Sequence, residues 1–190
     1  MKVWRKVKME TFRFQIGDQI KIKVKGLGKY TATVHKVDGD RALFIFDQCV
    51  ADRPMNENNK NEGGFVKSDL CKWLNEEFVK MLPDKVRSRI VADDEHSGLM
   101  IRIPTRGEMF GANENSEYYE VDSDAQLLLM KDRKNRICMS PDDEYCWYWL
   151  MNARRDSATS FALVYYDGSA YNFYASDSFG VRPAFVISDL

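Results

Sequence analysis

The sequence predicts one α+β domain spanning residues 1–190, in which strands come first, helices follow and strands return. Three observations carry this prediction. Short alternating or apolar runs fill residues 14–50, a helical stripe occupies residues 68–82, and Tyr-rich strand-like runs fill the last third of the chain. Because no repeat, long linker or composition break divides the chain, we expect the terminal strands to pair in one mixed or antiparallel sheet.

The first strands form a meander, with turns at residues 26–28 and at Asp38-Gly39, and residues 53–64 are polar enough to form a surface loop. The clearest helix begins after Ser68, a suitable N-cap, and ends before Pro83. Its apolar residues recur at helical spacing and should be buried: Leu70, Trp73, Leu74, Phe78 and Leu82.

Further helical turns are expected within residues 84–91 and, from capping-box spacing, after Thr105 and Ser123. A basic turn at residues 131–136 precedes the second group of strands, which we expect at residues 145–150, 161–166, 169–174 and 181–187. Asp167-Gly168 predicts a two-residue hairpin turn with both residues at positive φ and Tyr166 opposite Ser169.

Composition restricts the chemistry that the chain can perform. Phosphate-binding loops, nucleophile elbows and zinc-protease motifs are absent, so we do not expect an enzyme. No pair of cysteines has C-x-x-C spacing and the two histidines stand alone, so we expect no metal and no cofactor. Free thiols are expected, with a Cys138–Cys146 disulfide left as an alternative. The acidic residues at 122–124 and 142–144 are expected in solvated turns, and Arg182 as a structural cation.

Charge and hydropathy also restrict the partners. The net charge is −1, and the basic run Lys21, Lys23 and Lys25 alternates with apolar residues, which is typical of the solvent face of a strand and not of a nucleic-acid site. No stretch is long and apolar enough to insert into a membrane. Residues 1–13 lack the apolar core of a secretion signal, so we expect a protein that is cytoplasmic on synthesis.

One segment differs in composition from the rest of the chain. Residues 152–178 contain no Lys, Glu, Gln, Met or Trp, although these five types supply 43 of the 190 residues. At that rate about six would be expected in the 27-residue window. The segment is rich in Tyr, Ser, Asn, Asp and Arg, the residue types of antibody-like binding surfaces. We therefore interpret it as a binding face, the alternative being a Tyr-rich strand pair whose rings pack on their neighbours.

Several motifs resemble a domain of unknown function that is common in gut bacteria and their phages. The resemblance covers residues 16–188 in the family's order, and these segments carry it: Ser68-Asp69-Leu70, Trp73-Leu74-Asn75, Phe78, Ile103-Pro104-Thr105, Glu108, Phe110, Trp149-Leu150, Asp167-Gly168-Ser169 and Gly180-Val181-Arg182-Pro183-Ala184-Phe185. The chain departs from the family pattern at Met151-Asn152, where the family usually has Arg-Ser.

This resemblance implies a C-type-lectin-like fold, in the branch that is similar to formylglycine-generating enzymes. Some members resemble variable proteins of diversity-generating retroelements, in which adenine-directed mutagenesis rewrites AAC or AAT codons near the end of the gene. Lys, Glu, Gln, Met and Trp cannot arise from such codons, and they are the five types missing from residues 152–178. No residues match the reactive cysteines of the enzymes or the calcium motifs of sugar-binding lectins.

We therefore predict a hypervariable ligand-binding protein in which residues 1–151 and 180–190 form the scaffold and residues 152–179 form the variable region. The predicted contact residues are Asn152, Arg154, Arg155, Asp156, Ser157, Thr159, Ser160, Tyr165, Tyr166, Tyr171, Asn172, Phe173, Tyr174, Ser176, Asp177, Ser178 and Phe179. The predicted framework residues within and after this region are Ala162, Val164, Gly168, Ala175 and Gly180 to Phe185.

The expected ligand is a protein or a cell-surface molecule, which the chain would reach as part of a phage virion or through a carrier protein. Two alternatives remain open at this point. One is a non-variable phage or prophage structural domain of the same fold. The other is an enzyme of the formylglycine-generating type, with Cys138 or Cys146 as its reactive group.

Overall fold

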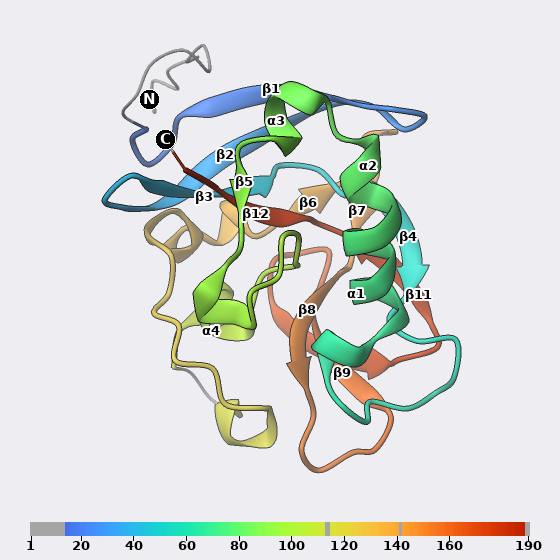
Figure 1. The fold of residues 1–190 in the computed structure, drawn as a ribbon. Coiled ribbons are helices and arrows are strands. Elements are labelled where there is room, and N and C mark those ends of the chain that lie inside the picture. The colour runs from blue at the N-terminus through green and yellow to red at the C-terminus, as the bar shows by residue number, and fades with distance from the viewer. Residues whose placement is uncertain (1–13, 113–114, 141, 189–190) are drawn as a thin grey trace.

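Two five-stranded sheets and a set of short helices build the fold (Figure 1). The computed structural model describes residues 14–112, 115–140 and 142–188, and the prediction about a secretion signal in residues 1–13 lies outside them. The architecture is mixed α+β with mostly antiparallel strands, as the sequence predicts. The first and last strands lie in one sheet, as expected, but five other strands form a second sheet, so the expectation that all strands share a single sheet is wrong.

The first sheet begins with the predicted meander. Its strands, in spatial order, are β1 (Gln19–Val24), β2 (Gly28–Asp38), β3 (Arg41–Phe46), β12 (Ala184–Ser188) and β5 (Ile90–Val91). All neighbours are antiparallel. Along β1 the lysines are exposed and the aliphatic residues are buried, which confirms the predicted alternation.

The second sheet contains the Tyr-rich strands. Its order is β10 (Ala170–Tyr174), β9 (Ser160–Val164), β8 (Tyr148–Ala153), β11 (Ser178–Val181) and β4 (Ala51–Pro54). Only β8 and β11 are parallel, joined at Gly180 and Tyr148. The predicted loop at residues 53–64 begins inside β4. The predicted strand at residues 145–150 is divided between β8 and β7 (Tyr145–Cys146), which forms a small hairpin with β6 (Cys138–Met139).

The predicted strand at 181–187 is also divided, because the chain crosses from one sheet to the other at Arg182-Pro183. The buried guanidinium of Arg182 donates from Nε to the carbonyl oxygen of Phe46 (2.7 Å) and from Nη1 to the hydroxyl of Tyr148 (3.1 Å). It also donates to the carbonyl of Asn135 (3.3 Å), and the Phe46 amide donates to Pro183 (2.9 Å). This confirms that Arg182 is a structural cation.

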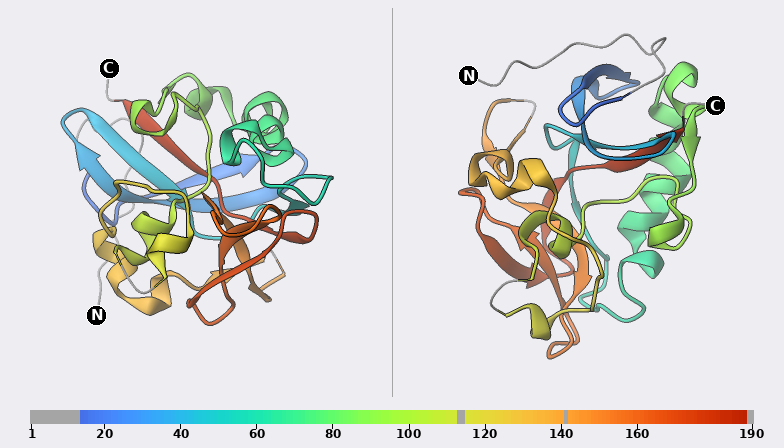
Figure 2. Two further views of the ribbon diagram at one scale, coloured as in Figure 1. Left: turned by 90° about the horizontal axis from the view of Figure 1, so that it is seen from below. Right: turned by 90° about the vertical axis from the view of Figure 1, so that its left-hand side faces the viewer.

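The main helix begins as predicted, with the Ser68 hydroxyl accepting a hydrogen bond from the amide of Cys71 (3.0 Å). It comprises α1 (Asp69–Trp73), a π turn (Leu74–Phe78) and α2 (Val79–Met81), and all five residues of the predicted stripe are buried. In Figure 1 this helix stands along the right-hand side of both sheets, and Figure 2 shows it beside them from two further directions. The next helix, α3 (Asp84–Arg87), is shorter than predicted because β5 pairs with β12.

One of the two predicted capping boxes forms. Thr105 caps α4 (Arg106–Phe110), with its hydroxyl accepting from the Glu108 amide and the Glu108 carboxylate accepting from the Thr105 amide. The second box, at Ser123, does not form a helix, because Asp124 bonds to the Thr105 hydroxyl (2.6 Å) and Gln126 bonds to the carbonyl of Met109 (3.0 Å). The basic residues 131–136 lie in 3-10 turns.

The core consists of two apolar clusters that lie on opposite faces of the same strands. The first joins the main helix to one face of each sheet, and the second contains Tyr148, Met109 and Met130 with residues from the other faces. Every residue of β9 and β12 is therefore buried. This explains why those strands read as continuous apolar runs.

We expect the substitution Arg182→Met to destabilise the protein by about 3–5 kcal/mol, because it leaves two carbonyls and a phenol hydroxyl buried without their donor. The free energy of unfolding in urea measures the effect. The matched control is Arg87→Met, which removes an exposed ion pair with Asp84 and should cost under about 1 kcal/mol. Equal costs for the two variants would contradict a structural role for Arg182.

Candidate ligand-binding surface

Residues 160–174 form the predicted hairpin, but its turn differs from the prediction. The Gly168 amide donates to the carbonyl of Tyr165 (2.9 Å), and the Tyr165 amide donates to the carbonyl of Ser169 (2.8 Å). Only Gly168 of the two turn residues has a positive φ (81°), so the turn has three residues and ends in a glycine bulge. The register therefore shifts by one residue, and Tyr171 faces Leu163 where Val164 was expected.

Strand β10 lies at the open edge of the second sheet. The Ser169 carbonyl accepts from the Tyr165 amide, and the Ala175 amide donates to the Thr159 carbonyl (2.7 Å). Since hydrogen-bonded pairs alternate along an antiparallel ladder, the odd-numbered residues of β10 form the hydrogen-bonded pairs with β9. The backbone groups of Ala170 and Asn172 consequently point away from the sheet. Tyr171 and Tyr174 are half exposed. The edge thus presents both side chains and main chain to a partner.

Aromatic rings contact one another along this hairpin, and the contacts continue onto β11. The rings of Trp147 and Tyr165 are 4.1 Å apart, and Trp147 stacks on Phe179 at 5.4 Å. We call the contacting rings the aromatic patch, which consists of Trp147, Tyr165, Tyr166, Tyr171, Phe173, Tyr174 and Phe179. Only Trp147 lies outside the predicted segment. Its place just before β8 gives no compositional signal, so the sequence did not identify it.

A polar loop borders the patch, and one scaffold residue holds this loop. The side-chain amide of Asn61 donates to the carbonyl oxygens of Arg154 (3.0 Å), Ser157 (2.7 Å) and Ser160 (3.0 Å). Its backbone amide donates to the carbonyl of Ala158 (2.9 Å). These bonds involve only the main chain of the loop, so they do not depend on which side chains the loop carries.

The scaffold holds the rest of the segment in the same way. The Asn56 amide donates to the carbonyl of Ala175 (3.0 Å), and the Arg155 amide donates to the carbonyl of Tyr118 (2.8 Å). At the hairpin turn, Arg136 donates to the carbonyl of Gly168 (2.9 Å) and Arg133 to that of Asp167 (2.7 Å). Arg133 also pairs with the Asp167 carboxylate. Apart from that pair, these contacts use backbone atoms of the segment.

Most of the predicted contact residues are accessible. The exposed ones are Arg155, Asp156, Tyr166, Tyr171, Tyr174, Ser176 and Ser178, and the partly buried ones are Arg154, Ser157, Thr159, Tyr165, Asn172, Phe173, Asp177 and Phe179. A hollow of about 340 Å³ is lined entirely by predicted residues: Arg154, Ser157, Ser160, Tyr171, Asn172, Phe173 and Tyr174. Buried Ser160 lies in the lining of this hollow. All the predicted framework residues are buried.

Asn152 is the exception among the predicted contact residues. It is buried, and its side chain accepts from the amide of Arg106 (2.6 Å) and donates to Asp122 (2.6 Å) and to the carbonyl of Glu120 (3.1 Å). With all these bonds inside the protein, the Asn152 amide is part of the scaffold, and we remove it from the contact set.

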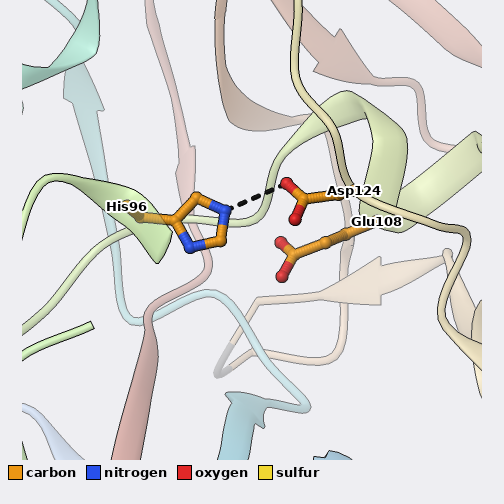
Figure 3. Close-up of side chains that lie close together, drawn as sticks. All are labelled: His96, Glu108 and Asp124. Atoms are coloured by element: carbon orange, nitrogen blue, oxygen red, sulfur yellow. Dashed lines mark hydrogen bonds and ion pairs between the residues drawn. The ribbon is translucent and has the colours of Figure 1, made fainter. Parts of the chain in front are cut away.

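A buried ion network beside this scaffold is the one group of described residues with metal-ligand geometry. Potential ligand atoms of His96, Glu108 and Asp124 lie within 4.8 Å of one another (Figure 3). However, both Glu108 oxygens accept from Arg102 (2.8 and 2.7 Å), and Asp124 Oδ2 accepts from His96 (2.9 Å) and from Thr105. Each of the two carboxylates already accepts hydrogen bonds from a cationic side chain, so we assign the group as a salt-bridge network.

The two histidines have opposite electrostatic environments. Burial alone would lower the pKa of His96, but hydrogen bonds to Asp124 and Asp93 outweigh it and raise this pKa to about 9. His35 is buried with no hydrogen-bond partner for either ring nitrogen among the described residues. Burial, aided by the positive charge of Arg182, lowers the pKa of His35 to about 3.

Neither cysteine of the enzyme alternative lines the hollow at β10. Cys138 and Cys146 face each other across β6 and β7 and belong to the second core cluster. All four cysteines are free, so the Cys138–Cys146 disulfide that the sequence left open is not formed.

The fold and this surface define the protein as an α+β domain that carries an exposed aromatic patch on a sheet edge. The chain belongs to the family described as a domain of unknown function, DUF6273, which matches residues 40–189. No curated protein and no solved structure matches the chain. Among the described residues, no helix has the length and apolar character needed to cross a membrane.

We expect Asn61→Asp to destabilise the protein by about 1–3 kcal/mol, because a carboxylate cannot donate and would instead face three carbonyl oxygens. Asn59→Asp is the matched control, since Asn59 is exposed, and should change the free energy of unfolding by under about 0.5 kcal/mol. Faster proteolysis within residues 154–160 of the Asn61 variant should accompany the loss. An unchanged loop would show that Asn61 does not hold it.

We expect the free energy of unfolding to be greatest near pH 6.5. The raised pKa of His96 gives stability that is complete below pH 6.5 and is lost, by about 3 kcal/mol, as pH rises through 9. The lowered pKa of His35 removes up to about 5 kcal/mol as pH falls from 6.5 toward 3. Urea unfolding at a series of pH values measures both slopes.

Two variants separate these slopes. His35→Leu should reduce the dependence of the free energy of unfolding on pH below 6.5, and His96→Gln should reduce it above 6.5. Neither substitution should change the slope on the other side. A wild-type profile that is level from pH 6 to 9 would contradict the ion network around His96.

Proposed function

We propose that this protein is a hypervariable ligand-binding protein with a C-type-lectin-like fold, in which a retroelement diversifies exposed positions within residues 152–179 and leaves the scaffold constant. The proposal is one of binding and not of catalysis. In it, the exposed side chains of the segment contact the ligand, and Trp147 adds a constant ring to the aromatic patch.

The observation that carries the proposal is the way the segment is held. A surface whose side chains vary must keep its backbone position whatever side chains it receives. Asn61, Asn56 and Arg136 bond to carbonyl oxygens of the segment, which every residue type provides. Buried framework residues such as Ala162 and Val164 supply the packing that the exposed positions do not.

The composition supports the same proposal. Lys, Glu, Gln, Met and Trp are absent after Met151, and the stretch without them includes the loop, hairpin and following turn that form the surface. Its exposed tyrosines and its Ser, Asn and Asp residues combine rigid aromatic area with adaptable hydrogen bonding, as in antibody binding sites. We expect Tyr171, Tyr174 and Arg154 to contribute most of the binding energy, since Tyr and Arg are enriched among such residues at interfaces.

The character of the surface favours a large ligand. The hollow beside β10 is open, and its aromatic rings and polar side chains extend over the sheet edge, which suits a protein or another cell-surface molecule. In this proposal the chain reaches such a ligand on a phage particle or through a carrier protein.

The DNA around the gene tests the proposal directly. We expect a reverse transcriptase gene and a template repeat that copies the codons for residues 152–179. The copies should differ mainly at template adenines, with AAC or AAT opposite exposed positions such as Tyr171 and Tyr174. Positions of the framework, such as Ala162 and Gly168, serve as the internal control and should have no adenine-rich codons. A neighbourhood without a reverse transcriptase or repeat would contradict diversification.

A further inference from the structure

Three of the four cysteines meet in the second core cluster, where the proposed function gives them no role. Cys49 follows β3, Cys138 lies on β6 and Cys146 lies on β7. The sulfur atoms of Cys49 and Cys138 are 3.0 Å apart, about 1 Å more than the roughly 2.05 Å of a disulfide bond. Cys49 also contacts the thiol of Cys146. Cys71 belongs to the first core cluster.

The surroundings hold the central thiol in place. The Cys49 amide donates to the carbonyl of Met139 (3.0 Å), which fixes its backbone beside β6. Gly180 packs so closely that a Cβ atom there would lie 2.6 Å from the Cys49 sulfur. The Cys49 sulfur therefore has no free space on the side where β11 packs. Only small movements along the sulfur–sulfur direction are needed to join it to Cys138.

The three thiols are not equivalent. Cys146 retains 9% of its surface exposed, whereas Cys49 and Cys138 retain 1% and 0%. The hydrogen bond from Cys49 lowers the pKa of Cys146, while burial raises the pKa of Cys49 well above its usual value. Cys146 is therefore both the most accessible thiol of the three and the one that more readily forms a thiolate than Cys49.

We propose that Cys49 and Cys138 form a reversible disulfide, and that Cys146 is the thiol through which a low-molecular-weight disulfide such as oxidised glutathione oxidises them. Cys49 contacts both of the other thiols, the more accessible Cys146 and the fully buried Cys138. This inference does not rest on the proposed ligand-binding function.

The oxidation proceeds through three thiol–disulfide exchange steps. Cys146 thiolate attacks oxidised glutathione, forming a mixed disulfide and releasing one glutathione, which takes up the proton that Cys146 lost. Cys49 then attacks the Cys146 sulfur, giving its proton to the second glutathione as it leaves. Finally Cys138 attacks Cys49, and its proton returns to Cys146. Two thiols have been oxidised and one glutathione disulfide has been reduced to two thiols.

The last step favours the disulfide between Cys49 and Cys138 for two reasons. A thiol of lower pKa leaves faster, so Cys146 is the better leaving group when Cys138 attacks Cys49. The product also places the disulfide between two fully buried residues, away from external thiols. This disulfide would connect residues that are 89 positions apart. It would cross-link the segment between β3 and β4, which passes from one sheet to the other, to the β6–β7 hairpin that precedes Trp147.

The test uses the full chain in buffers that contain reduced and oxidised glutathione at varied ratios. Alkylation and mass spectrometry count the free thiols, and peptide mapping identifies the bridge. We expect oxidation to remove two thiols, to link Cys49 to Cys138, and to raise the melting temperature by about 5–15 °C. Retention of four thiols in oxidised glutathione would overturn the proposal, as would a final bridge between Cys49 and Cys146.

Two single variants isolate the role of Cys146. Cys146→Ser should slow bridge formation at least tenfold while the final extent stays the same, and Cys71→Ser is the matched control that should leave the rate unchanged. An equal rate in the two variants would overturn the role of Cys146 as the entry thiol. Melting temperatures of the reduced variants establish that both are folded, and Cys138→Ala, which should form no buried bridge, gives a second check.

Discussion

The buried guanidinium of Arg182 is the interaction on which the two-sheet arrangement depends. It lies where the chain passes from β11 to β12 and hydrogen-bonds to the end of β3, to Tyr148 on β8 and to the carbonyl of Asn135. Because an isolated charge is costly to bury, this cation is stable only while all three segments stay in place. The crossing also sets the close packing of Gly180 on Cys49 and the parallel pairing of β11 with β8.

This crossing separates the molecule into a scaffold and a surface. Strand β12, which follows the crossing, and strand β9 are buried on both faces, and the hairpin of β9 and β10 continues the second sheet to an open edge. Residues such as Asn61 then fix the loop beside that edge through carbonyl oxygens alone. The side chains exposed at the edge are not needed for these backbone contacts, and this independence underlies our proposal of a replaceable binding surface.

Signals that act over a few residues predicted their elements well. Ser68 and Thr105 cap helices as expected, the lysines of β1 alternate with core residues, and the framework residues of the segment are buried. Features that depend on distant partners were missed. Asp167-Gly168 suits both two- and three-residue turns, and only pairing with β9 selects the bulge. Asn61 and Trp147 lie outside the composition gap, and nothing local marks the backbone and ring contacts that they make.

The central claim is that the exposed side chains between residues 152 and 179 determine what the protein binds, while the scaffold determines that it folds. A library that randomises Arg154, Tyr166, Tyr171, Asn172 and Tyr174 on the otherwise unchanged chain, selected against an unrelated protein, tests it most directly. The account predicts that most members fold with melting temperatures near that of the parent and that selection yields specific binders of the new target. Recovery of only unfolded members, or of binders whose affinity survives reversion of all five positions, would contradict it.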